Sequence, residues 1–160
     1  MAAVKLRYEI DLANAIAVSA VEDAEVRPIT RADLVSLADL MLEAYRGTID
    51  YEDETYEEAV AEVESFLGDR PLLEHSFLAE VAGATASAVL VTTNREDPFI
   101  AYVMTHPAHK NRGLGRYLVS LAAASLADSG YDRVAPHITE GNVPSEALFR
   151  SVGARLVTEA

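Results

Sequence analysis

The residues with the clearest chemical potential lie between Lys110 and Arg116, in the run KNRGLGR. Gly113 and Gly115 stand one residue apart, just before an apolar pattern with helical spacing. Glycines at the start of a helix leave backbone N–H groups accessible, and the positive end of the helix dipole favours an anion there. Three of the chain's 13 Lys and Arg residues fall in this run, although the formal net charge is −13. The pattern predicts a bound phosphate or pyrophosphate.

Two familiar nucleotide-binding motifs do not fit this glycine pair. The dinucleotide fingerprint needs three glycines near the first strand, followed by an acidic residue about 20 positions later. Here Gly113 and Gly115 come late in the chain and are followed by Tyr117 and Leu118. A Walker loop would continue with Gly-Lys-Ser or Gly-Lys-Thr, which is absent. The run therefore belongs to another class of anion site.

Composition narrows the type of protein. A chain of 160 residues, half of them apolar, is most simply one domain that buries roughly 70% of its unfolded surface. The absence of cysteine excludes disulfides, thiolate metal sites and cysteine nucleophiles, and we expect no metal centre. The excess of negative charge argues against nucleic acid as a partner, because phosphate contacts need a basic face.

The N-terminal residues do not resemble a targeting segment. Residues 1–12 carry four charged side chains, and no window approaches 18 uncharged apolar residues. We therefore expect a cytoplasmic protein without a membrane partner.

Hydrophobic periodicity and turn residues predict an α/β (α+β) domain, with a mixed sheet flanked by helices on both faces. The expected strands cover 26–30, 75–81, 84–92, 99–105, 133–139 and 155–158. The expected helices cover 30–47, 114–127 and 144–151, and an acidic loop with a second helix covers 50–65.

The pattern from Val26 to about Thr158 resembles the GNAT superfamily of acyl-CoA-dependent N-acetyltransferases. The phosphate loop of that family reads Arg/Gln-x-x-Gly-x-Gly/Ala and follows a strand and a proline. This chain has Lys110-x-x-Gly113-x-Gly115, with Pro107 upstream. Lysine keeps the positive charge of the first position but lacks the planar fork of arginine.

A second family motif places a Tyr about seven residues after an Asn, and a Gly four residues further on. Asn142, Phe149 and Gly153 match it, with Phe in place of Tyr. The resemblance implies a mostly antiparallel GNAT-like sheet in a domain over residues 25–160. It also implies transfer of an acetyl group from acetyl-CoA to a primary amine of a small molecule or protein, by direct attack in a ternary complex. A non-catalytic acyl-CoA-binding sensor or regulatory module is the alternative.

The resemblance also implies a set of cofactor-binding residues. The backbone groups of Val103, Met104 and Thr105 would pair with the pantetheine arm, as an added strand pairs with a sheet edge. The pyrophosphate would be held by backbone N–H groups of the glycine loop, which come from Asn111, Arg112, Gly113, Leu114, Gly115 and Arg116. Lys110 and Arg116 would add charge, Asn142 would hydrogen-bond the arm, and Phe149 would pack against it.

Acetyl transfer to an amine needs a base for the ammonium proton and an acid for the leaving thiolate. Family members often use a Tyr as that acid, but Phe149 has no hydroxyl. A CoA thiolate is nevertheless a tolerable leaving group, and a water or another Tyr could serve as the acid. For the base we favour His137 or Glu140, near the end of a predicted strand. A strand histidine without a role and a solvated turn carboxylate are the alternatives.

Eight carboxylates lie between Asp50 and Glu64, with no basic residue among them. They form either an electronegative rim that attracts a cationic amine or a solvated helix face. Because the first two helices often cover the substrate site in the GNAT family, the resemblance places Tyr45 and Tyr51 in the acceptor pocket.

Residues 1–24 extend beyond the resemblance. GNAT proteins commonly finish with two strands after the last helix, but only 154–160 remain here. We expect the run VKLRYEI to supply the missing partner as an extra edge strand, within the chain or across a homodimer.

Overall fold

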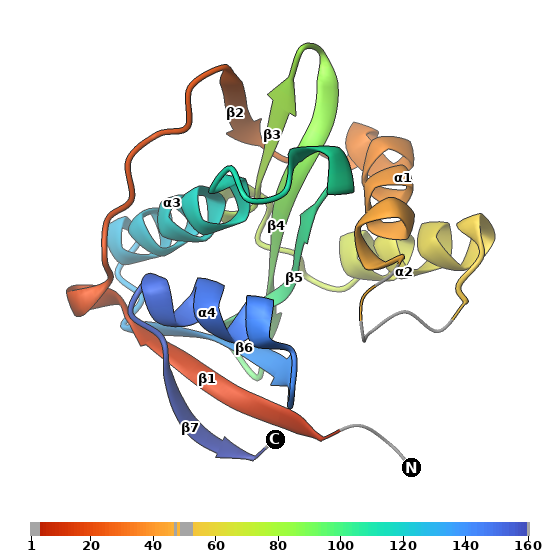
Figure 1. Ribbon diagram of the computed structural model, residues 1–160. Helices are drawn as coiled ribbons and strands as arrows, with labels where there is room; N and C mark the ends of the chain where they lie inside the picture. The colour runs from red at the N-terminus through yellow and green to blue at the C-terminus, as the bar shows by residue number, and fades with distance from the viewer. Residues whose placement is uncertain (1–3, 47, 49–52, 160) are drawn as a thin grey trace.

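Strands of the computed structural model form one sheet in the order β2-β3-β4-β5-β6-β1-β7, within described residues 4–46, 48 and 53–159 (Figure 1). Only β5 and β6 run parallel, and the other neighbours are antiparallel. The bounds are β1 Lys5–Asp11, β2 Ala24–Pro28, β3 Phe77–Val81, β4 Ala84–Asn94, β5 Asp97–Thr105, β6 Arg133–Thr139 and β7 Arg155–Glu159. The predicted mixed, mostly antiparallel sheet is confirmed.

Helices cover both faces of this sheet. α1 (Leu34–Tyr45) and α2 (Tyr56–Gly68) lie on one face, and α3 (Leu114–Asp128) and α4 (Val143–Ser151) lie on the other (Figure 1). Successive residues of β4 serve the two sides: Leu90 packs with α1 and α2, whereas Val89 and Val91 pack with α3. This alternation is the period-two pattern of a strand buried on both faces. No helix among the described residues is long and apolar enough to span a membrane.

Capping boxes start the two helices of the first face. Asp33 accepts from the backbone N–H of Thr30 and also takes two hydrogen bonds from Arg27, at 2.7 and 2.9 Å. The expected N-cap at Thr30 therefore begins a 3-10 turn, and α1 follows at Leu34. Thr55 and Glu58 form the second box, so α2 begins at residue 56, inside the predicted segment, and ends at Gly68.

The sequence predicts the N-terminal strand at an edge of the sheet, and this prediction is wrong. β1 lies between β6 and β7 of the same chain, with Leu6 opposite Ile138 and Tyr8 opposite Leu156. The edge is β7. Tyr8 is fully buried, and its hydroxyl donates to Glu146 of α4 at 2.9 Å. β1 thus completes the sheet beneath α4.

Two irregularities separate β5 from β6. The β4–β5 register shifts so that Leu90 faces Tyr102 and Val91 faces Ile100, which leaves Ala101 as a bulge. The parallel pairing with β6 consists of Phe99 with Ala135 and Ile100 with Pro136. Because Pro136 has no N–H to donate, it cannot continue the ladder. The strands diverge beyond it.

Candidate functional site

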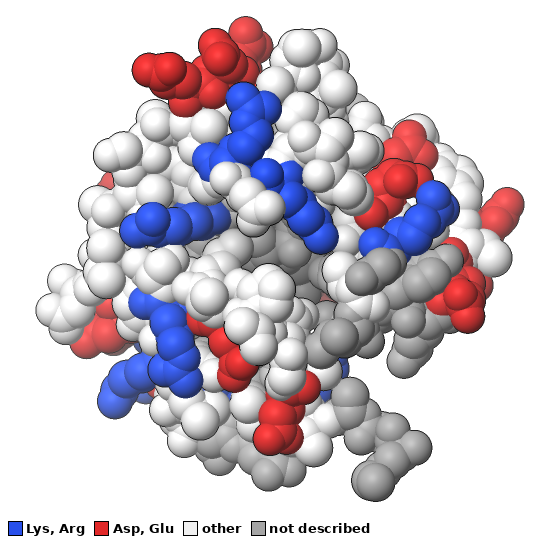
Figure 2. Space-filling model, viewed as in Figure 1, with Lys and Arg blue, Asp and Glu red and all other residues white. Residues whose placement is uncertain are grey.

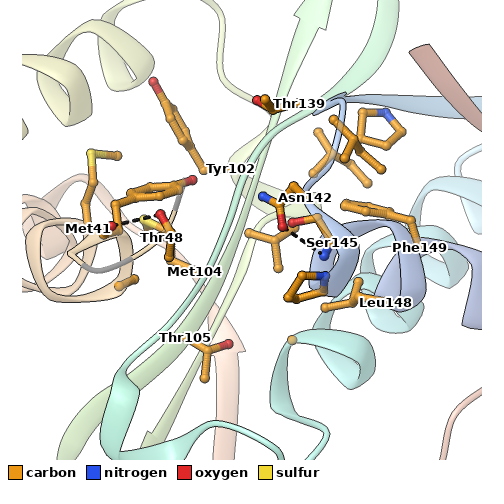
Figure 3. A pocket seen from close by; sticks show the side chains of 18 of the residues that line it. Met41, Thr48, Tyr102, Met104, Thr105, Thr139, Asn142, Ser145, Leu148 and Phe149 are labelled. Atoms are coloured by element: carbon orange, nitrogen blue, oxygen red, sulfur yellow. Dashed lines mark hydrogen bonds between the residues drawn. The ribbon is translucent and has the colours of Figure 1, made fainter. Parts of the chain in front are cut away.

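A cavity of about 1150 Å³ occupies the space where β5 and β6 diverge. Its walls come from α1 and α2 on one side and from α4 and the end of β6 on the other, with the N-terminus of α3 between them. Figure 3 shows the two walls: Met41, Thr48 and Tyr102 face Asn142 and Ser145 across the opening. This cavity is the candidate functional site, and most of the residues that the sequence predicts for cofactor binding line it.

The glycine loop enters α3 through left-handed backbone. Asn111 has φ +64° and Gly113 has φ +82°, and no side chain caps the helix that begins at Leu114. Asparagine and glycine tolerate this conformation better than other residues. The uncapped first turn leaves N–H groups accessible, as an anion site requires.

Most of the loop residues predicted to bind the cofactor line the cavity: Lys110, Asn111, Gly113, Leu114, Gly115 and Arg116. Arg112 does not. Its side chain lies beside His109, with 3.3 Å between Nη1 and Nδ1, and borders a separate hollow near Asp23. In Figure 2, Lys and Arg side chains gather above the hollow at the centre of the view.

Gly115 lies where α3 meets β5 and α4. A Cβ atom at this position would approach Leu148 Cδ1 to 3.1 Å, Thr105 Oγ1 to 3.3 Å and Val103 Cγ1 to 3.4 Å. These distances are shorter than most real Cβ contacts. The second glycine of the loop is thus needed for close packing, whereas Gly113 is needed for its backbone conformation.

The β5 wall contributes Val103, Met104 and Thr105, all of which line the cavity. Ser87 on β4 is fully buried and supports this wall. Its hydroxyl donates to the Met104 carbonyl at 2.8 Å and lies 2.9 Å from Thr105 Oγ1. Ser87 of the neighbouring strand β4 therefore fixes the part of β5 that is predicted to contact the cofactor arm.

Asn142 caps the N-terminus of α4. Its side-chain oxygen accepts from the Ser145 N–H at 3.3 Å, and both residues line the cavity (Figure 3). Phe149 lies one turn after Ser145, is 5% exposed and lines the same wall. An Asn that caps the helix explains its position in the motif independently of any ligand contact.

The two residues proposed as bases are placed differently. His137 lines the cavity, and its ring meets Phe99 edge-on at a centroid distance of 4.8 Å. Partial burial, with the nearby charges of Arg7 and Lys5, lowers the pKa of His137 and so favours the neutral imidazole. Glu140 is exposed and is not among the residues that line the cavity.

On the opposite wall, Tyr45 lines the cavity, and Tyr51 lies outside the described residues. Sequence reasoning missed Tyr102 of β5, whose hydroxyl donates to Glu62 of α2 at 2.5 Å. Burial, followed by the bond and charge of Glu62, raises the pKa of Tyr102 well above its usual value.

Acidic residues line only one side of the cavity within the part of the chain that the structure describes. Glu54, Glu58 and Glu62 follow each other at intervals of four along and just before α2. The positive residues Lys5, Lys110 and Arg116 line other walls. No group of three or more His, Asp or Glu side chains in the described ranges is arranged to hold a metal ion.

A family model described as FR47-like protein matches residues 78–160, just over half of the chain. The match includes β4, β5, the glycine loop, α3, β6 and α4, which build much of the cavity. The chain belongs to this family, and hence to the GNAT superfamily that the sequence resembles. A search of curated protein sequences found no match.

Solved structures share the fold at low sequence identity. A GCN5-related N-acetyltransferase from Sphaerobacter thermophilus aligns with TM-score 0.78 and 18% identity, over 99% of this chain and 50% of that one. The chain thus spans about half the length of that relative. The ribosomal-protein-S18-alanine N-acetyltransferase of Escherichia coli has TM-score 0.67 and 18% identity, over 81% and 76% of the two chains.

A third relative was solved with coenzyme A. The PaiA N-acetyltransferase of Thermoplasma acidophilum has TM-score 0.67 and 15% identity, over 80% of this chain and 87% of that one. At these identities the likeness establishes the fold, and the activity of this chain must be argued from its own cavity.

Proposed function

We propose that this protein is an N-acetyltransferase that moves an acetyl group from acetyl-CoA to a primary amine by direct attack in a ternary complex. The observation that carries the proposal is the uncapped, positively charged N-terminus of α3, which opens into a cavity large enough for two substrates. GNAT membership supports acyl-CoA as the donor.

The glycine loop would bind the pyrophosphate. Its N–H groups are accessible at the start of α3, and Lys110 and Arg116 add positive charge at the cavity wall. From there the diverging edge of β5 leads along Thr105, Met104 and Val103. That edge would pair with the pantetheine arm as a strand is added to a sheet.

His137 would take the proton that the attacking nitrogen loses. Its lowered pKa keeps the imidazole neutral near pH 7, which is the form that accepts a proton. Glu140 is the weaker candidate because its side chain does not line the cavity. The thiolate would take its proton from water or from a tyrosine, since Phe149 cannot supply one.

A second function is supported by one observation. Phe149 occupies the cavity wall at the position where GNAT proteins often have a catalytic Tyr, and it brings no hydroxyl there. A module that binds acyl-CoA without transferring the acyl group would have the same cavity. Acetyl transfer is the better conclusion because the acceptor side of the cavity is also built, with Tyr45 and Tyr102.

Calorimetric titration with acetyl-CoA and with free CoA tests the donor site, and we expect micromolar binding. Lys110→Ala and Arg116→Ala should each weaken binding about two- to fivefold, the effect of one charge at a helix end. Arg95→Ala in the β4–β5 hairpin, outside the cavity, is the matched control. Thiol release with a panel of amines then separates transfer from simple binding. Absence of CoA binding by the folded protein would refute both functions.

A further inference from the structure

Glu62 is an exposed residue that lines the α2 side of the cavity, where one hydrogen bond orients its carboxylate. The hydroxyl of Tyr102, on strand β5, donates a hydrogen bond to Oε2 of Glu62 at 2.5 Å. No other hydrogen bond or ion pair of Glu62 occurs among the described residues, so Oε1 can accept from a ligand. Because the phenol donates as a neutral group, it orients the carboxylate and leaves its charge intact.

The wall of the cavity formed by β6 and the neighbouring β1 would repel a second positive charge. Lys5 lines the cavity near His137, and Arg7 stands opposite His137 on the neighbouring strand. Lys110 and Arg116 line the donor end of the cavity, where the pyrophosphate of acetyl-CoA would neutralise them, so they do not attract or repel the acceptor strongly. A cation that enters beside acetyl-CoA is therefore most stable against α2, where Glu62 is located.

The chemistry of the transfer separates this bound cation from the reacting atom. A nitrogen attacks only with a free lone pair, whereas a carboxylate stabilises the charged ammonium form. The nitrogen that Glu62 binds should therefore not be the one that is acetylated. A substrate that uses both features carries two amino groups, one charged at Glu62 and one neutral at the thioester.

We propose that the acceptor is a diamine or polyamine, and that Glu62, oriented by Tyr102, binds the ammonium group that does not react. This inference rests on the proposed acetyltransferase function and names its acceptor class. The neutral nitrogen forms a bond to the thioester carbon and the C–S bond breaks, with its electron pair staying on sulfur. The nitrogen loses one proton to His137, and the ammonium at Glu62 keeps all of its protons.

The test compares 1,4-diaminobutane with 4-amino-1-butanol, which has the same length but a hydroxyl in place of the second amine. Thiol release at saturating acetyl-CoA gives kcat/KM for each amine. We expect the wild type to prefer the diamine by at least about tenfold, the scale of one hydrogen bond to a charged group. In Glu62→Gln this preference should vanish through a higher KM for the diamine. Its kcat/KM for the amino alcohol should fall much less than that for the diamine, because a hydroxyl carries no charge for Glu62 to pair with, and its KM for acetyl-CoA should stay near the wild-type value.

Two further variants separate binding from general effects. Tyr102→Phe should reduce the ratio of kcat/KM for the diamine to kcat/KM for the amino alcohol, because Glu62 keeps its charge but loses the hydrogen bond that orients it. A merely structural defect would lower both rates alike and leave this ratio unchanged. Glu64→Gln, an exposed carboxylate of α2 that does not line the cavity, should behave as wild type.

A wild type that acetylates both amines equally, or Glu62→Gln that retains the preference, would overturn the inference and leave the acetyltransferase intact. The inference also fails if other amines in the panel react and neither of these two does. If the protein binds CoA and no amine reacts, the proposed function itself is wrong, and the acceptor site falls with it.

Discussion

The two glycines of the loop should respond to alanine for different physical reasons. In Gly113→Ala the new Cβ meets only Val21 Cγ2, at 4.0 Å, so space is not limiting. The backbone, however, has φ +82°. A residue with a Cβ pays about 1–2 kcal/mol in this left-handed region. The melting temperature of a chain of this size should fall by roughly 2–8 °C.

In Gly115→Ala the loss of stability should come from crowding of the new Cβ and not from the backbone conformation. Its backbone is helical, so alanine gains about 0.5–1 kcal/mol of helix stability. The Cβ must displace Leu148, Thr105 and Val103, which would lie 3.1–3.4 Å away, and such overpacking costs about 1–3 kcal/mol. The net loss of stability is about 0–2.5 kcal/mol. Since all three displaced residues line the cavity, the larger effect should be on CoA binding.

The assay is thermal unfolding of each variant, followed by calorimetric titration with CoA. Gly68→Ala is the control, because it has no neighbour within 4 Å and no positive φ; it should be neutral or slightly stabilising. Gly115→Ala should lose more CoA affinity than its fall in melting temperature accounts for. If it binds CoA like the wild type, or if Gly113→Ala melts like the wild type, the reasoning about the loop is wrong.

Further predictions concern pH and proton transfer. Hydrogen bonds from Arg27 lower the pKa of Asp33, so the stability it contributes is complete above pH 3.8 and is lost as the pH falls through the lower folded-state value. Asp33→Asn should cost about 1–3 kcal/mol at pH 7 and flatten that acid loss in thermal unfolding. His137→Ala should lower kcat without changing the Kd for acetyl-CoA, and a wild-type rate would exclude it as the base. Arg7→Gln should raise the pKa of His137 and move the acid limb of the kcat/KM profile to higher pH. Phe149→Tyr should raise kcat in the thiol-release assay by about tenfold or more if proton donation limits the rate, and an unchanged kcat would place that proton elsewhere.

Local signals predict most of the elements and the loop that lines the cavity at the start of α3. The glycine spacing, the charge of Lys110 and Arg116 and the following helical pattern lie within a few residues of each other, so their meaning depends little on the rest of the fold. Sheet order is different. The alternation of VKLRYEI predicts a strand, but nothing in it specifies a place between β6 and β7, because that depends on partners about 120–150 residues away.

The acceptor side depends on contacts between distant segments. Glu62 and Tyr102 are 40 residues apart, and their hydrogen bond exists only because α2 packs over the face of β5 that Tyr102 occupies. The sequence alone leaves open whether the carboxylates of α2 form a solvated helix face or an electronegative rim that attracts a cationic amine. His75 shows the same limit: it was assigned to a strand, but it is buried in a 3-10 turn and lies 2.6 Å from Ser125 of α3.

The bulge at Ala101 links these observations. In a regular strand Ile100, Tyr102 and Met104 would share one face. Here Ile100 packs on the α3 side, and the extra residue turns Tyr102 and Met104 towards α1 and α2. The same stretch is opposite Pro136, which ends the pairing with β6. One local interruption of the sheet thus opens the cavity, exposes the β5 edge that we propose for the donor and brings Tyr102 to Glu62. The proposed donor and acceptor sites would therefore meet at this point of the strand.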